Sequence, residues 1–167
     1  HLKDEYIRAT YTSNSKLYFV GEHIYEIDYP NKIKTYLLTE DFRKTFEVPI
    51  IQELNNEFFV VSKISNYYYT YNENQLSKKK FNGSFDYIQN LAIIDNAPWL
   101  CTPNGIIKYE NEKATTYFSD FNVSYIFKDK QKNYWISTVN SGLLFIQDFK
   151  NNFIPLSPKP TVFSYYD

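Results

Sequence analysis

The sequence contains no methionine, one cysteine, two histidines and four glycines among its 167 residues. A single cysteine cannot form a disulfide within the chain. With two histidines, one of them terminal, it also cannot supply a zinc site of the usual kind. Four glycines are too few for the glycine-rich phosphate loops of nucleotide-binding folds, and no G-x-S-x-G pattern is present. We therefore expect no metal, no cofactor and no catalytic residue in this segment, which is not expected to be an enzyme.

Long apolar runs and an excess of one charge are missing as well. No stretch reaches the roughly eighteen apolar residues that a membrane-spanning helix needs. The formal net charge of −1 gives no general attraction for nucleic acid or for an anionic membrane. Neither nucleic acid nor a membrane is therefore expected to contact this segment. The sequence begins without methionine, and we expect it to be a segment of a longer protein.

Aromatic residues are abundant, with 17 tyrosines, 14 phenylalanines and two tryptophans making up 20% of the chain. Aromatic and β-branched residues favour strands, whereas methionine, a good helix former, is absent. Clusters of asparagine, aspartate, serine, glycine and proline interrupt the apolar stretches at short intervals, as tight hairpin turns require. The composition therefore predicts an all-β protein.

The chain repeats itself with a period of about 40 residues. The stretch YWISTVNSGLLFI at 134–146 matches PWLCTPNGIIKY at 98–109, and Trp135 and Trp99 take the same place in the two copies. Phe59 takes that place in a second, weaker match, and Tyr18 in a third. We call these four residues the anchors. Each period has room for four short strands, and the predicted copies cover 5–38, 48–81, 85–118 and 123–156.

A four-stranded sheet that is apolar on both faces must pack against neighbouring copies, and radial packing of such sheets gives a β-propeller. The sequence therefore predicts an all-β fold, a β-propeller segment over 1–167 built of about four four-stranded antiparallel blades. In the last copy the fourth strand is expected at 151–156. An open stack of four blades would expose apolar faces. The expected partners are therefore further blades of the parent chain or a second copy of the segment.

The stretch 123–146 closely resembles the two-component regulator propeller repeat. That repeat has an aspartate after an apolar strand, an asparagine near a tryptophan, a threonine three residues later and a glycine in the following hairpin. In the last copy these places are taken by Asp129, Asn133, Trp135, Thr138 and Gly142. In the third copy they are taken by Asp95, Trp99, Thr102 and Gly105, with a shortened turn. In the first two copies the resemblance rests on spacing and strand pattern.

The resemblance implies a periplasmic, extracytoplasmic location in the sensor region of a hybrid two-component system histidine kinase, of the kind found in Bacteroidetes. Such regions usually hold two seven-bladed propellers, followed by an immunoglobulin-like domain, a membrane helix and the kinase. Four repeats would then be an incomplete ring. The leading hypothesis is a sensor that binds a glycan-derived ligand. A propeller scaffold for protein–protein interaction, with no small-molecule ligand, is the alternative, and an enzyme on a propeller would need clustered acids or a histidine that the sequence does not offer.

Tyr67 and Tyr69, in the run NYYYTY at 66–71, are the candidate ligand contacts, because outward tyrosine rings can stack on a sugar. The alternative is that these rings pack between blades. Trp99 and Trp135 are expected to serve blade packing, since a residue that recurs at one place in each copy serves the repeat. Cys101 is expected to be an inert core thiol. The lysines of SKKK at 77–80 are expected on a solvated outer strand.

Overall fold

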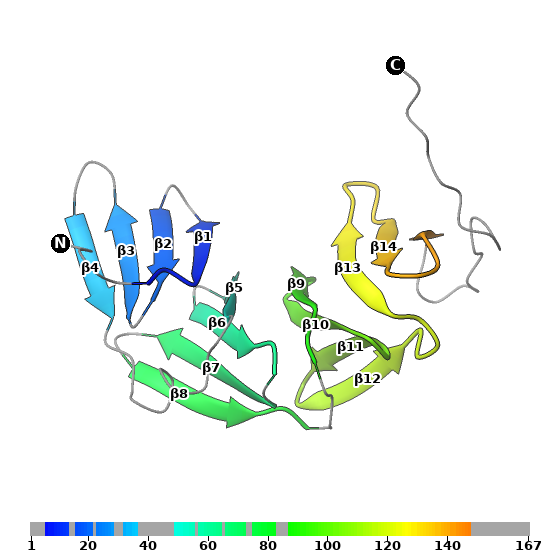
Figure 1. The fold of residues 1–167 in the computed structure, drawn as a ribbon, viewed down its shortest axis with the longest axis horizontal. Coiled ribbons are helices and arrows are strands. Elements are labelled where there is room, and N and C mark those ends of the chain that lie inside the picture. Colours follow the sequence, from blue (N-terminus) through cyan, green and yellow to red (C-terminus); the bar gives the residue numbers. More distant parts are fainter. Residues whose placement is uncertain are drawn as a thin grey trace, which may run out of the picture. The chain divides into compact units, whose positions relative to one another are not determined.

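The computed structural model describes residues 6–13, 16–21, 23–28, 32–36, 49–55, 57–64, 66–72, 75–82 and 87–147. In these residues the chain forms fifteen β-strands arranged in four antiparallel sheets (Figure 1). Within each sheet the strands follow one another in chain order, each pairing with the next. The described residues contain no helix of the length and apolarity that crossing a membrane requires. The predicted all-β class is confirmed.

The chain divides into two compact units, the first of which is His1–Tyr87. Its first sheet contains β1 (Ala9–Ser13), β2 (Lys16–Val20), β3 (Ile24–Asp28) and β4 (Lys32–Tyr36). Its second sheet contains β5 (Pro49–Leu54), β6 (Glu57–Ser62), β7 (Tyr67–Asn72) and β8 (Gln75–Lys80). The two sheets share one apolar core, formed by Tyr18, Val20, Ile24, Ile51, Phe58, Val60, Tyr69 and Tyr71.

The second unit is Ile88–Asp167. Its first sheet contains β9 (Asn90–Ile94), β10 (Ala97–Thr102), β11 (Gly105–Glu110) and β12 (Lys113–Tyr117). Its second sheet contains β13 (Val123–Lys128), β14 (Tyr134–Thr138) and β15 (Leu143–Ile146). The fourth strand predicted at 151–156 lies outside the described residues. The shared core is formed by Ile94, Ala97, Trp99, Cys101, Ile106, Val123, Ile126, Tyr134, Ile136, Leu144 and Ile146.

Burial along the strands explains why single sheets cannot stand alone. All six residues of β10 are buried, and so are five of the six residues of β6, so both faces of these second strands are covered. By contrast, β12 is exposed over four of its five residues, and residues 77–80 of β8 are exposed. β6 and β10 are thus core strands, whereas β8 and β12 are edge strands, where lysines discourage unwanted pairing.

Two hairpins close through turns that the sequence specifies locally. Asp95 and Asn96, between β9 and β10, both have positive φ angles, of 52° and 57°. Asn111 and Glu112, between β11 and β12, have φ angles of 50° and 62°. Positive φ at both central residues is the type I′ geometry, which matches the twist of the flanking strands. Asparagine and aspartate tolerate this region, whereas Glu112 adopts it because the two flanking strands fix the turn length.

Candidate functional site

The threonine and glycine of the repeat close the same turn in both sheets of the second unit. Thr138 Oγ1 donates a hydrogen bond to the Gly142 carbonyl at 2.8 Å and accepts one from the Ser141 amide at 2.9 Å. In the preceding sheet Thr102 Oγ1 donates to the Gly105 carbonyl at 2.9 Å and accepts from the Asn104 amide at 3.2 Å. The threonine side chain therefore bridges the turn before the third strand in each copy.

The two turn glycines differ in their surroundings. Gly105 has a φ of +98°, and a Cβ atom added there would overlap the Tyr117 carbonyl oxygen and lie 2.7 Å from the Phe118 carbonyl oxygen. Gly142 has a φ of +72°, and nothing lies within 4 Å of the added atom. Both positions therefore require positive φ, but only Gly105 is also enclosed by backbone, at the last residue of β12 and the residue after it.

Asp129 organises the turn between β13 and β14. Its Oδ1 accepts a hydrogen bond from the Asn133 amide at 2.8 Å, and its Oδ2 accepts bonds from Asn133 Nδ2 and from Trp135 Nε1, each at 2.9 Å. Burial acts to raise the pKa of Asp129, but the hydrogen bonds from Trp135 and Asn133 outweigh it and hold that pKa below its usual value. We call these three residues the Asp129 clasp. Through the hydrogen bond from Nε1, the clasp holds the anchor Trp135 against the turn between β13 and β14.

Asp95, which takes the same place in the preceding copy, makes different contacts. Its Oδ1 accepts a hydrogen bond from Lys128 Nζ at 2.7 Å, and its Oδ2 accepts a longer one from the Tyr134 hydroxyl at 3.4 Å. The hydrogen bond from Lys128 lowers the pKa of Asp95. The shortened turn is the physical reason, because Asp95 itself forms the type I′ corner, and Trp99 Nε1 donates instead to the Ile94 carbonyl at 3.3 Å. Asp95 therefore links two sheets, whereas Asp129 closes one turn.

The two tryptophans also lie in different environments. Trp99 is 3% exposed, and its ring stacks on Tyr117 and lies against Tyr134 of the next sheet, with both centroid separations at 5.8 Å. Lys108 Nζ lies 5.5 Å from the Trp99 ring centroid. Trp135 is half-buried, and its ring contacts Phe145 of its own sheet at 4.6 Å. Both sit at one repeat position, but within the described residues only Trp99 is covered by a following sheet.

We expect acid to destabilise the second unit through these carboxylates. A lowered pKa in the folded state means that the stabilisation is present above the unfolded-state pKa of about 4 and is lost as the pH falls through the folded-state pKa. Thermal unfolding between about pH 6 and pH 3 should therefore show a falling midpoint. The Asp129→Asn variant should show a shallower fall, because asparagine carries no carboxyl group that takes up a proton as the pH falls.

Asp120→Asn, on the exposed turn after β12, is the control for the loss of one carboxylate. Asp95→Asn should change the free energy of unfolding by no more than the ~0–1 kcal/mol of a solvent-exposed ion pair, since the Asp95 side chain is 60% exposed. An Asp129→Asn variant that keeps the full wild-type pH dependence would show that ionisation of the clasp is not what acid removes.

A buried carboxylate that the sequence analysis did not single out lies in the first unit. Glu26 is 8% exposed, and its Oε1 lies 2.7 Å from Lys16 Nζ. Tyr18 is the cross-strand neighbour of Glu26, and its pKa is raised first by burial and then by the charges of Glu26 and Glu53. The ion pair compensates the buried charge beside the anchor Tyr18. Neither the repeat nor any known motif marks this position in the sequence.

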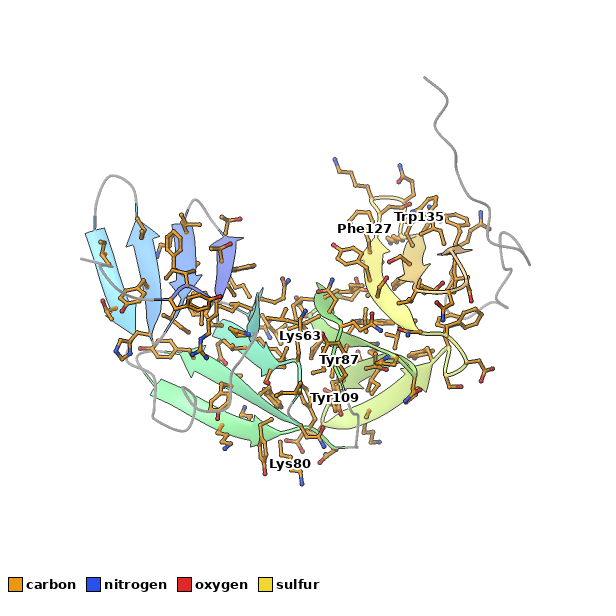
Figure 2. All side chains as sticks on the ribbon, in the orientation of Figure 1. Lys63, Lys80, Tyr87, Tyr109, Phe127 and Trp135 are labelled. Atoms are coloured by element: carbon orange, nitrogen blue, oxygen red, sulfur yellow. The ribbon has the colours of Figure 1, made fainter. Side chains whose placement is uncertain are left out.

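The two tyrosines predicted as ligand contacts differ in their exposure to solvent. Tyr69 is 1% exposed and belongs to the core of the first unit, so its ring serves packing between sheets and the expectation of a ligand contact there is wrong. Tyr67 is 37% exposed, and Lys78 Nζ lies 4.5 Å from its ring centroid. Tyr67 pairs across the strands with Lys80, which Figure 2 shows on β8. An exposed tyrosine ring with ammonium groups beside it can stack on a sugar and donate hydrogen bonds to its hydroxyls.

Groups with catalytic potential are few in the described part of the chain. Cys101 is fully buried, and burial raises the pKa of its thiol to about 12, so it is held as a protonated core residue. His23 lies against Tyr25 with ring centroids 6.3 Å apart. Across the described ranges, no three histidine, cysteine, aspartate or glutamate side chains gather where a metal ion could bind.

Solved structures with the same fold are found, although no protein-family model and no curated protein matches the sequence. Virginiamycin B lyase from Staphylococcus aureus is 17% identical, with a TM-score of 0.68 over 95% of this chain and 58% of the lyase. The extracellular domain of a putative hybrid two-component system from B. thetaiotaomicron is 18% identical, with a TM-score of 0.61 over 84% of this chain and 21% of that domain. A second such extracellular domain from the same organism is 16% identical, with a TM-score of 0.56.

These likenesses establish the fold class. The four antiparallel sheets of three or four strands match the corresponding parts of propeller proteins, and the predicted β-propeller fold is confirmed. At these identities the likeness shows the fold alone, and a lyase and two extracellular domains of putative hybrid two-component systems on one fold illustrate why fold does not fix function. The chain spans 58% of the length of the lyase and 21% of the length of the first two-component domain.

Proposed function

We propose that this chain is a segment of an extracytoplasmic sensor propeller of a hybrid two-component system histidine kinase, and that it binds a glycan-derived ligand without chemically changing it. The observation that carries the proposal is the resemblance of the second unit's repeat to the two-component regulator propeller repeat. There Thr102 with Gly105 and Thr138 with Gly142 make the same hydrogen bonds at the same place of two successive sheets. The fold shared with two extracellular domains of putative hybrid two-component systems supports it.

The burial, pKa shifts and hydrogen bonds of the reactive side chains support a role in binding rather than catalysis. The single thiol is buried with a raised pKa, and the carboxylates of lowered pKa, Asp95 and Asp129, are engaged by lysine, tyrosine, asparagine and tryptophan donors. A carboxylate used in acid–base catalysis near neutral pH needs a raised pKa instead. These groups therefore stabilise the repeat and are not poised to move protons.

The ligand contact that we propose is the exposed ring of Tyr67 on β7, with Lys78 and Lys80 on the neighbouring edge strand. Sugar recognition combines an aromatic surface with hydrogen-bond donors, and this patch supplies both. Lys78 lies over the Tyr67 ring at 4.5 Å, so a neutral sugar would approach the remaining exposed part of the ring. The side chains at 77–80 are exposed, which leaves the patch open to solvent.

Titration with a panel of neutral oligosaccharides, followed by calorimetry and by tyrosine fluorescence, tests this proposal. We expect saturable binding of at least one oligosaccharide and about a fivefold or greater loss of affinity in Tyr67→Ala, if a sugar ring stacks with the about 1–3 kcal/mol of a base on an aromatic side chain. Tyr87→Ala is the matched control, because Tyr87 is 38% exposed and has Lys63 Nζ 6.0 Å from its ring centroid (Figure 2). Binding that survives Tyr67→Ala unchanged would remove this residue from the site, and no binding by any oligosaccharide would refute the glycan ligand.

A further inference from the structure

The three lysines of β8 are divided between the two faces of their sheet. Cross-strand pairing sets Lys80 beside Tyr67 and Lys79 beside Tyr68. Successive side chains of a strand lie on opposite faces, so Lys78 shares the face of Lys80. All three lysines are exposed. Two of them therefore lie on the face of the exposed Tyr67 ring, and the third lies on the other face.

Positive charge is concentrated on this edge of the sheet. Three of the six residues of β8 are lysines, and neither β7 nor β8 contains an acidic residue. The chain as a whole has a formal net charge of −1, so the excess here is local. Lys78 Nζ lies 4.5 Å from the Tyr67 ring centroid, and Lys80 is the direct cross-strand neighbour of Tyr67, a place where Cβ atoms are about 4.5–5.5 Å apart. We call these three residues the Tyr67 patch.

Burial on the other face fixes the backbone that carries the Tyr67 patch. The Phe81 amide donates a hydrogen bond to the Asn66 carbonyl at 2.9 Å, which continues the pairing of β7 and β8 beyond Lys80. The Phe81 side chain is 2% exposed, and its ring centroid lies 4.6 Å from that of Tyr68. The end of β8 is therefore held against the start of β7. A ligand meets a patch whose backbone is already ordered, which lowers the entropic cost of binding.

A ligand that packs on the Tyr67 ring also covers part of the two neighbouring lysines. A neutral sugar removes water from an ammonium group and offers only hydroxyl oxygens in return, so the charge stays uncompensated. A sugar that carries a carboxylate or sulfate group brings the opposite charge. Hydrogen bonds between charged partners are about twice as strong as those between neutral ones. The chemistry of the Tyr67 patch therefore favours an acidic sugar over a neutral sugar of the same shape.

We propose that the Tyr67 patch binds an acidic glycan, with a sugar ring against Tyr67 and a carboxylate or sulfate group paired with Lys78 and Lys80. This inference rests on the proposed function, because it names the class of glycan that the same patch takes. Protection of the sheet edge does not distinguish the three lysines, since all of them lie on the edge strand. Binding uses only the two on the Tyr67 face, so Lys79 provides a control within the same strand.

Calorimetric titration with charged and neutral forms of one glycan tests the class of ligand. Oligogalacturonate is compared with its methyl ester, and a sulfated galactan oligosaccharide with its desulfated form, so the two pairs also distinguish carboxylate from sulfate. We expect the charged form of at least one pair to bind about tenfold more tightly than its neutral form. Added salt should weaken binding of the charged form and leave that of the neutral form nearly unchanged.

The outcomes separate this inference from the proposed function. Equal affinities of the charged and neutral forms would overturn the acidic preference and leave glycan binding intact. Binding of none of the four forms would count against the glycan ligand itself, and the acidic preference would be refuted with it.

Lys80→Gln and Lys79→Gln distinguish a specific site from a general attraction between charges. Each variant removes one positive charge from an exposed position of the same strand, so their net charges are identical. Lys80→Gln should weaken binding of the charged form about threefold, because Lys78 shares the anionic group, and the double variant Lys78→Gln, Lys80→Gln should lose the whole of the about tenfold preference. Lys79→Gln should bind as the wild type does, with circular dichroism confirming that all variants are folded. Equal losses in Lys79→Gln and Lys80→Gln would mean that β8 attracts any polyanion, nucleic acid included, and would overturn the proposal.

Discussion

Replacing Gly105 by alanine is expected to destabilise the second unit by about 3 kcal/mol or more, whereas the same change at Gly142 should cost about 1–2 kcal/mol. Both glycines have positive φ, so alanine at either position carries the conformational cost of that region. At Gly105 the new methyl group would also overlap the Tyr117 carbonyl and crowd that of Phe118. Backbone atoms cannot move aside as a flexible side chain can, so β12 must shift.

Urea unfolding followed by tryptophan fluorescence measures the difference in unfolding free energy between Gly105→Ala and Gly142→Ala. Both tryptophans of the chain, Trp99 and Trp135, lie in the second unit, so their fluorescence reports on that unit. Gly142→Ala is the built-in control, because it has the same repeat position and the same sign of φ without the steric overlap. Equal losses of stability at the two positions would show that positive φ alone sets the cost and that the close approach of the chain after β12 does not.

The repeat in the sequence predicted the sheets because its signals are local. Turn residues and apolar stretches place the second strand of each sheet, and the anchors Phe59 and Trp99 lie on β6 and β10 as the period requires. The matching repeat positions of Asp95 and Asp129 did not predict their hydrogen-bond partners. Their hydrogen bonds depend on the length of the turn, which moves Asp95 into the corner and leaves its carboxylate to Lys128 of the next sheet. A shared repeat position therefore fixes the backbone more firmly than the side-chain partners.

The tyrosine run shows a second limit of sequence reasoning. Alternation along β7 correctly places Tyr67 and Tyr69 on one face, opposite Tyr68, which stacks on Phe59 at 4.7 Å. Alternation does not say what covers that face, and Tyr69 is buried in the core shared with the first sheet while Tyr67, at the start of the strand, remains exposed. The sequence placed the lysines of β8 on an outer strand, and in the structure Lys78 of this strand lies over the exposed Tyr67 ring.

Trp99→Ala is expected to cost about 3–5 kcal/mol of unfolding free energy, the usual loss for a buried aromatic residue, because the ring is 3% exposed and fills the space between two sheets. Trp135→Ala should cost only about 1–2 kcal/mol, because it loses its contact with Phe145 and one hydrogen bond to Asp129. Circular dichroism, with the remaining tryptophan as a second probe, measures both variants. Trp99→Phe should recover part of the loss.

The contrast between the two anchors tests whether cover by a following sheet sets the cost of losing the ring. Trp99 packs against Tyr134 of the next sheet, whereas Trp135 contacts Phe145 of its own sheet and donates a hydrogen bond to Asp129. Equal losses of unfolding free energy in Trp99→Ala and Trp135→Ala would mean that the repeat position itself, and not packing between two sheets, sets the cost.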